Sequence, residues 1–187
     1  MNIITSEYTA PDNVDLVLKR TVFKFRSLFN VTDVHGQLVF KVRRRLFSWL
    51  DDTIVILDAN GNPLATLRDM NGTWHAYKGE STCKSDIIFL AKRHSCFSLN
   101  TRMDVFVAND KDNTNCDFIL KQTFRRNNCK IYSGISEEFK DQVAQIRTIQ
   151  SCFFGRNKYL CKISPNVDGA FVVALYAIVE GEQSRPN

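Results

Sequence analysis

The sequence lacks the features by which enzymes and membrane-spanning proteins are usually recognised. It contains no Gly-x-Ser-x-Gly elbow, no glycine-rich phosphate loop and no His-Glu-x-x-His helix. With six cysteines and three histidines, a Cys–His nucleophile pair could meet only by chance proximity in the fold. Its most prominent apolar run, 170–179, has ten residues, whereas a membrane-spanning helix needs about twenty. We therefore expect a protein that is neither an enzyme nor a membrane-spanning protein.

Targeting and metal-binding signals are also missing. The first fifteen residues carry three acids and no base and have no apolar core, which excludes a secretory signal. No cysteine pair has the Cys-x-x-Cys spacing of a metal site, so we expect no cofactor and no metal. We expect a cytoplasmic protein, peripheral at a membrane or nuclear, in which all cysteines are reduced thiols. The cysteines are Cys83, Cys96, Cys116, Cys129, Cys152 and Cys161.

The composition is that of a folded domain with a mild basic bias. The chain has 187 residues, 44% of them hydrophobic, which suffices for one sizeable core and does not require a second domain. Phenylalanine is prominent, with fourteen copies. A net charge of +5 is compatible with anionic partners but does not demand them. No feature of the sequence indicates an oligomeric state.

Short apolar or alternating runs that end at turn residues recur along the chain, which predicts strands. His35-Gly36, Asn60-Gly61-Asn62-Pro63 and Asn71-Gly72 are turn sequences. About a dozen strands at spacings of roughly ten to fourteen residues, without long helical patterns between them, predict an antiparallel barrel or sandwich. The predicted strands are 14–19, 22–26, 29–32, 38–42, 53–57, 64–68, 74–78, 87–91, 104–108, 118–123, 130–132, 143–148 and 159–163.

The apolar run 170–179 departs from this pattern. Asp168 before it could cap the start of a helix, and Gly181 after it could cap the end. A helix that is apolar on every side must be enclosed, and a large barrel could enclose it. Its β-branched residues also suit one more central strand. Periodicity alone leaves both interpretations open.

An ordered set of segments resembles the plant LURP-one-related family. These segments are 31–42 (VTDVHGQLVFKV), 57–64 (LDANGNPL), 77–82 (YKGEST), 104–109 (DVFVAN) and 165–168 (PNVD). That family is similar in fold to the tubby C-terminal domain and the phospholipid scramblases, which form a twelve-stranded barrel threaded by a hydrophobic helix. The resemblance implies an N-terminal tail (1–13), one barrel domain (14–182) with its central helix at about 169–180, and a C-terminal tail (183–187).

The resemblance also implies a class of function. The family is linked to plant defence, and tubby domains bind phosphoinositide headgroups through lysine and arginine. The chain lacks the proline-rich arm and the cysteine cluster of scramblases, so lipid scrambling is not implied. We expect a non-enzymatic binding or membrane-tethering module that recognises anionic phospholipid headgroups, with a protein-interaction scaffold as the alternative. The family has no agreed site motif to transfer.

Two basic clusters are candidates for an anionic-lipid site. The first combines bases with a neighbouring aromatic, and the second surrounds a turn; apolar residues beside bases could enter a membrane interface. The alternative is that Lys41 and Arg43 occupy the solvated face of a strand while Trp49 packs inward. Nucleic acid is not expected, because aromatics are not interleaved with the bases. The candidate residues are Lys41, Arg43, Arg44, Arg45 and Trp49, with Arg125, Arg126 and Lys130.

Overall fold

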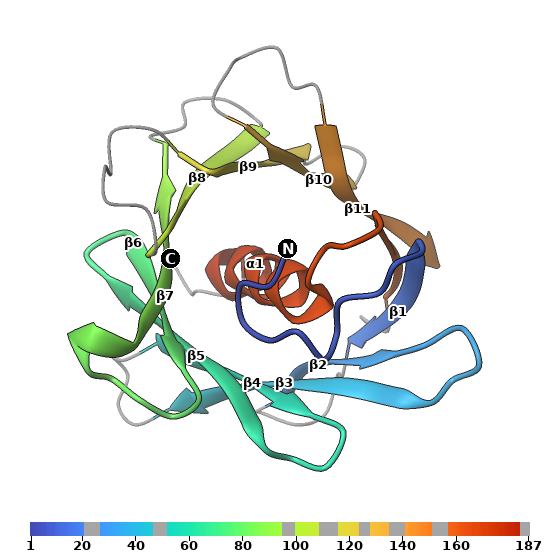
Figure 1. The fold of residues 1–187 in the computed structure, drawn as a ribbon, viewed down its shortest axis with the longest axis horizontal. Helices are drawn as coiled ribbons and strands as arrows, with labels where there is room; N and C mark the ends of the chain where they lie inside the picture. The colour runs from blue at the N-terminus through green and yellow to red at the C-terminus, as the bar shows by residue number, and fades with distance from the viewer. Residues whose placement is uncertain are drawn as a thin grey trace.

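Twelve antiparallel strands form a closed barrel around a single helix (Figure 1). The computed structural model describes residues 1–20, 27–46, 52–94, 100–108, 116–123, 128–134, 141–150 and 157–183. Each strand pairs with its sequence neighbours, and β1 closes the barrel by pairing with β12. The predicted barrel is confirmed and the sandwich is excluded.

The element bounds follow the sequence-predicted strands closely, apart from the predicted strand 22–26, which lies outside the described residues. The first six strands are β1 (Val14–Arg20), β2 (Ser27–Thr32), β3 (Leu38–Leu46), β4 (Asp52–Asp58), β5 (Pro63–Met70) and β6 (Thr73–Lys78). A short 3-10 helix, η1 (Lys84–Asp86), precedes β7 (Ile87–Arg93). The remaining elements are β8 (Asn100–Val107), β9 (Phe118–Thr123), β10 (Asn128–Ser133), β11 (Asp141–Gln150), β12 (Lys158–Ile163) and α1 (Gly169–Gln183).

Alternation along the strands separates the core from the surface. In β3, Phe40 and Val42 are fully buried, whereas Arg43, the next residue along the strand, is exposed. Tight turns join several strands, and Gly36 and Gly61 adopt φ of 88° and 98°, values that side chains rarely allow. The predicted turns at these glycines are therefore confirmed, and they set the register of the β2–β3 and β4–β5 hairpins.

Helix α1 occupies the centre of the barrel, and its side chains from Ala170 to Val179 are all buried (Figure 1). Apolar side chains on every side of the helix meet inward side chains of the surrounding wall. The structure thus selects the helix over the alternative of a further strand. Among the described residues, no helix is long and apolar enough to cross a membrane.

One predicted helix cap is confirmed and the other is wrong. The Asp168 carboxylate accepts backbone N–H bonds from Ala170 at 2.9 Å and Phe171 at 3.3 Å, as an N-cap does. Gly181 does not end the helix, which continues to Gln183. The glycine instead allows the helix to pack closely on β4, because a Cβ at this position would lie 2.7 Å from Cδ1 of Ile54 and one of the two would have to move.

The first residues of the chain lie against the beginning of the helix (Figure 1). The second carboxylate oxygen of Asp168 accepts N–H bonds from Ile3, Ile4 and Thr5 at 3.2, 2.7 and 2.9 Å. The Gly169 N–H donates to the carbonyl of Tyr8 at 3.0 Å. We call the barrel end where α1 begins the N-rim and the opposite end, where α1 ends, the C-rim.

Candidate functional site

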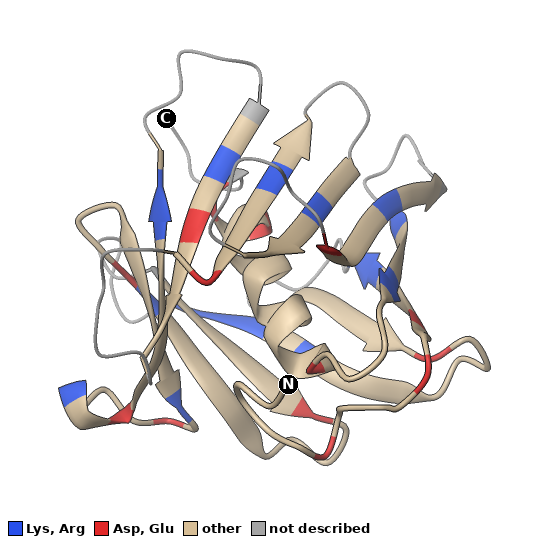
Figure 2. Ribbon diagram, turned by 45° about the horizontal axis from the view of Figure 1, so that its top comes forward, with Lys and Arg blue, Asp and Glu red and all other residues tan. Residues whose placement is uncertain are grey.

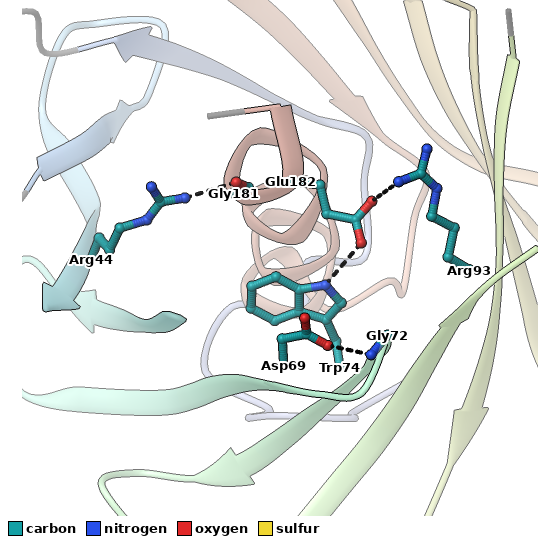
Figure 3. Close-up of polar contacts among 7 residues, drawn as sticks. All are labelled: Arg44, Asp69, Gly72, Trp74, Arg93, Gly181 and Glu182. Carbon is teal, nitrogen blue, oxygen red and sulfur yellow. Dashed lines mark hydrogen bonds and ion pairs between the residues drawn. The ribbon is translucent and has the colours of Figure 1, made fainter. Parts of the chain in front are cut away.

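The strand alternation of β3 divides the predicted arginine triplet. Arg43 is exposed on the outer wall. Arg45 is also on the outer wall, where it forms an ion pair with Glu80. Arg44 points inward, and its guanidinium donates to the carbonyl of Gly181 on the central helix at 2.8 Å (Figure 3). Three consecutive arginines therefore do not form one patch.

Arg44 belongs to a polar clamp around the last turn of α1, shown in Figure 3. Glu182 accepts a hydrogen bond from Nε1 of Trp74 at 3.2 Å and forms an ion pair with Arg93 at 3.1 Å. Trp74 and Arg93 come from β6 and β7, so the clamp joins the helix to both of these strands and to β3. Cations beside the last carbonyls of a helix also complement its dipole. Arg44 is thus engaged in holding the helix.

A third arginine approaches the helix from β1. The guanidinium of Arg20 lies 4.0 Å from the carboxylate of Glu180, which is a buried acid. Glu180 also accepts a hydrogen bond from the hydroxyl of Tyr176 at 2.9 Å. Burial, reinforced by the negative charge of Glu180, raises the pKa of the Tyr176 phenol well above its usual value. Sequence reasoning missed Arg20 and Arg93, because each belongs to a two-base Lys-Arg step at the end of a strand rather than to a longer cluster.

The two predicted basic clusters lie on opposite walls of the barrel. Lys41 is on β3, where its ammonium donates to the carbonyl of Ala59 at 2.9 Å, whereas Lys130 is on β10. Strands β3 and β10 face each other across the helix (Figure 1). Trp49, Arg125 and Arg126 lie outside the described residues. The structure therefore does not bring the clusters together on one wall.

Charge is distributed unevenly along the barrel axis (Figure 2). Bases are concentrated on the strand segments toward the C-rim, and acids are concentrated toward the N-rim. The described bases of the C-rim include Arg20, Arg43, Arg45, Arg68, Lys92, Arg93 and Lys158. The described acids of the N-rim include Asp12, Asp33, Asp58, Asp117 and Asp141.

A cleft of about 740 Å³ with polar and apolar lining opens on the outer wall of β1, β11 and β12, near the N-rim. Its lining includes Asp15, Gln142, Gln145 and Lys162, and the β2–β3 turn at Asp33 forms one side. None of the predicted lipid-binding residues lines it. Its volume is within the usual range for small-molecule sites.

The described thiols and imidazoles give little support to a nucleophilic site. Cys83, Cys116, Cys129 and Cys161 are free, while Cys96 and Cys152 lie outside the described residues. Burial raises the pKa of Cys129 to about 12, so this thiol stays protonated at neutral pH. Burial also lowers the pKa of His75, whose ring stacks on Tyr77 at a centroid distance of 6.2 Å. No cluster of potential metal ligands occurs among the residues that the structure describes.

These features define a class: a closed antiparallel barrel built around a buried hydrophobic helix, with charged groups at its rims. Comparison with known proteins then identifies the family. The chain belongs to the LURP-one-related family, whose model matches residues 14–180. The resemblance seen in the sequence is therefore confirmed.

Relatives match this chain over nearly its whole length, and a solved structure shares its fold. Protein LURP-one-related 15 of Arabidopsis thaliana is 34% identical over 95% of this chain and 84% of its own length. Protein LURP-one-related 10 of the same plant is 34% identical over 96% of this chain and 95% of its own. An X-ray structure of an Arabidopsis thaliana protein matches with a TM-score of 0.75 and 32% identity, covering 97% and 98% of the two chains.

Proposed function

We propose that the protein is a non-enzymatic module that binds anionic membrane surfaces through its C-rim. The observation that carries the proposal is the separation of charge along the barrel axis, with bases toward the C-rim and acids toward the N-rim (Figure 2). Such a distribution orients the molecule in the field of an acidic membrane, with the C-rim toward the lipid. The N-rim is then directed into solution.

The positions of the basic clusters favour this end-on orientation. Because β3 and β10 lie on opposite walls, a flat surface can approach both only at a barrel end. Both Arg45 and Lys130 lie toward the C-rim ends of their strands. The predicted lipid residues Trp49, Arg125 and Arg126 lie outside the described residues. They remain part of the proposal on sequence grounds.

The structure distinguishes surface bases from structural ones within the predicted site. Arg43 is exposed, and the Arg45–Glu80 pair is on the outer wall, where ion pairs contribute little and exchange readily. Arg44 holds the helix through Gly181. We therefore assign membrane attraction to Arg43 and Arg45, and helix anchoring to Arg44. Peripheral attachment of this kind would suit a role in plant defence signalling, to which the family resemblance points.

Vesicle co-sedimentation tests the proposal. Each base near an acidic surface contributes about 1 kcal/mol, so changing both Arg43 and Arg45 to Ala should weaken binding roughly thirtyfold. Added salt should weaken binding further by screening. Lys84→Ala, an exposed base on η1 near the N-rim, is the matched control and should bind like the parent. Arg44→Ala should lower the melting temperature, because Arg44 anchors the helix, and should change vesicle binding less than the loss of Arg43 and Arg45 does.

Negligible binding to both phosphatidylserine vesicles and neutral vesicles would contradict this proposal. A protein-interaction scaffold would then be the better function. The cleft at Asp15, Gln145 and Lys162 favours that second candidate, because it provides a recessed surface away from the C-rim. Substitutions in the cleft that abolish capture of a defined partner would support it.

A further inference from the structure

The cleft on the outer wall of β1, β11 and β12 contains an acid and a base that do not pair with each other. Asp15 of β1 is directly opposite Lys162 of β12, so their Cβ atoms lie about 5 Å apart. Both residues line the cleft. Among the residues that the structure describes, neither side chain forms an ion pair or a hydrogen bond. Both charges are therefore available to a ligand.

The two side chains extend from the outer wall into the cleft. Leu16 beside Asp15, and Cys161 and Ile163 beside Lys162, are buried. Side chains alternate between the two faces of a strand, so the acid and the base project outward. Asp15 is partly buried and Lys162 is exposed, which makes the acid the more enclosed of the two.

Neighbouring polar groups add hydrogen-bond acceptors. Gln145 of β11 is directly opposite Lys162, and its amide nitrogen donates to Asn128 at 3.2 Å. The amide oxygen of Gln145 remains as an acceptor. Asp33, in the turn at one side of the cleft, accepts the N–H of Gln37 at 2.8 Å with one carboxylate oxygen, which leaves the other.

Apolar side chains lie beside these polar groups. Val34, next to Asp33 in the turn, lines the cleft and is 61% exposed. Ala144 and Ile163 also line the cleft and are buried. A ligand that covers Val34 removes apolar surface from water, which favours binding. The cleft thus combines an acid, a base and an apolar surface.

The lining argues against several classes of ligand. Its described residues include two acids, Asp15 and Asp33, and one base, Lys162, which disfavours phosphates and other polyanions. No aromatic side chain is among these lining residues, so they offer no platform on which a nucleobase could stack. A simple cation would leave Lys162 unpaired, and a simple anion would leave Asp15 unpaired. A ligand that carries both charges pairs with both residues.

We propose that the cleft binds a small zwitterion with an apolar side group, of the class of α-amino acids and short peptides. The ammonium of the ligand pairs with Asp15, its carboxylate pairs with Lys162, and its side group covers Val34. Hydrogen bonds between charged groups are stronger than those between neutral groups, and a partly buried charge is screened less by salt. The inference does not depend on membrane binding, because the cleft opens near the N-rim.

Isothermal titration with leucine and with the dipeptide leucyl-leucine measures the site directly. N-acetyl-leucine, which lacks the ammonium, and leucinamide, which lacks the carboxylate, should each bind about tenfold more weakly than leucine, because each loses one charge-assisted contact. Tighter binding of leucyl-leucine than of leucine would assign the cleft to peptides, and the reverse would assign it to free amino acids. Absence of binding of both zwitterions at low salt, or equal binding of leucine and its two blocked forms, would overturn the proposal.

Variants match each charge of the ligand to its residue. Asp15→Asn should weaken leucine binding about tenfold and leave N-acetyl-leucine binding unchanged, whereas Lys162→Gln should weaken both and leave leucinamide binding unchanged. Asp12→Asn and Lys158→Gln, at exposed residues outside the cleft, are the matched controls and should bind like the parent. Equal losses for all three ligands in Asp15→Asn would overturn the assignment of the ammonium and with it the proposal.

Melting curves separate loss of the site from loss of the fold. Because neither Asp15 nor Lys162 has a side-chain partner among the described residues, both single variants should melt close to the parent. Weaker binding together with a clearly lower melting temperature in both variants would give the two residues a structural role and overturn the proposal.

Discussion

At the scale of single residues, Asp168 joins two parts of the chain that are far apart in sequence. One of its carboxylate oxygens caps α1, and the other accepts the backbone N–H groups of Ile3, Ile4 and Thr5. The side chain is fully buried. A short acid is well suited to this position, because two oxygens on one carbon can face two different backbone segments.

We predict that Asp168→Ala destabilises the protein by about 3 kcal/mol, since it removes a helix cap and leaves several N–H groups without an acceptor. Urea unfolding at neutral pH measures the loss. Asp33→Ala, which removes one bond to Gln37 in an exposed turn, should cost much less. A change at Asp168 no larger than that at Asp33 would contradict the joining role.

Gly181 is a second residue whose role depends on a contact. In a helix interior, Ala is normally more stable than Gly by about 1 kcal/mol. Here the added Cβ would lie 2.7 Å from Cδ1 of Ile54, which is itself fully buried. Close approach of the helix to β4 therefore opposes the usual preference.

We predict that Gly181→Ala destabilises the parent by about 1–2 kcal/mol, as overpacking does. In an Ile54→Val background, where Cδ1 is absent, the same change should cost less or become stabilising. Thermal melts of the four proteins form a double-mutant cycle. Additive effects would show that the contact with Ile54 does not determine the cost.

At the scale of elements, α1 functions as the core around which the wall closes. Phe171 packs edge-on against Phe89, with ring centroids 5.3 Å apart, and at a tilt against Phe118, with ring centroids 5.0 Å apart. Phe89 comes from β7 and Phe118 from β9, so one helical side chain connects two parts of the barrel. At the other end of α1, the clamp of Arg44, Trp74 and Arg93 performs the same task with polar groups (Figure 3).

We predict that Phe171→Ala costs about 3–5 kcal/mol in the free energy of unfolding, because it leaves a cavity among buried aromatic rings. Val34→Ala, at a side chain that is 61% exposed, is the size-reducing control and should be nearly neutral. Chemical unfolding of both variants makes the comparison. A loss below about 1 kcal/mol at Phe171 would contradict the central role of the helix.

At the scale of the whole molecule, the interior keeps several titratable groups neutral. Burial raises the pKa of the Cys129 thiol from 9.0 to about 12, and it also raises the pKa values of Cys161 and Tyr176. In the unfolded chain these groups lose their protons at ordinary pKa values. Between the two values the unfolded state binds fewer protons than the folded state, so rising pH favours unfolding.

We predict that stability contributed by these groups is fully present below pH 9 and is lost progressively as pH rises toward 12. Urea unfolding at a series of alkaline pH values should show this decline. Cys129→Ala should reduce the steepness of the decline, while Cys83→Ala, at an exposed thiol, should leave it unchanged. Equal slopes in all three proteins would contradict the contribution of Cys129.

Local patterns in the sequence determined much of this protein. The positions of the strands, the turns at Gly36 and Gly61, and the cap at Asp168 could all be predicted, because each depends on residues close together in the chain. The run 170–179 indicated a helix or a strand, and family resemblance selected the helix. Turns and caps formed by residues that are neighbours in the sequence can be predicted without knowing the fold.

Only the tertiary structure decided what the charged residues do. It separated Arg44, which bonds the helix, from the exposed Arg43, and it placed β3 and β10 on opposite walls. It also placed Asp15 and Lys162, which are far apart in sequence, opposite one another in a single cleft. The physical reason is that strand register and barrel closure bring distant residues together, and Coulomb interactions depend on distance in space rather than separation along the chain.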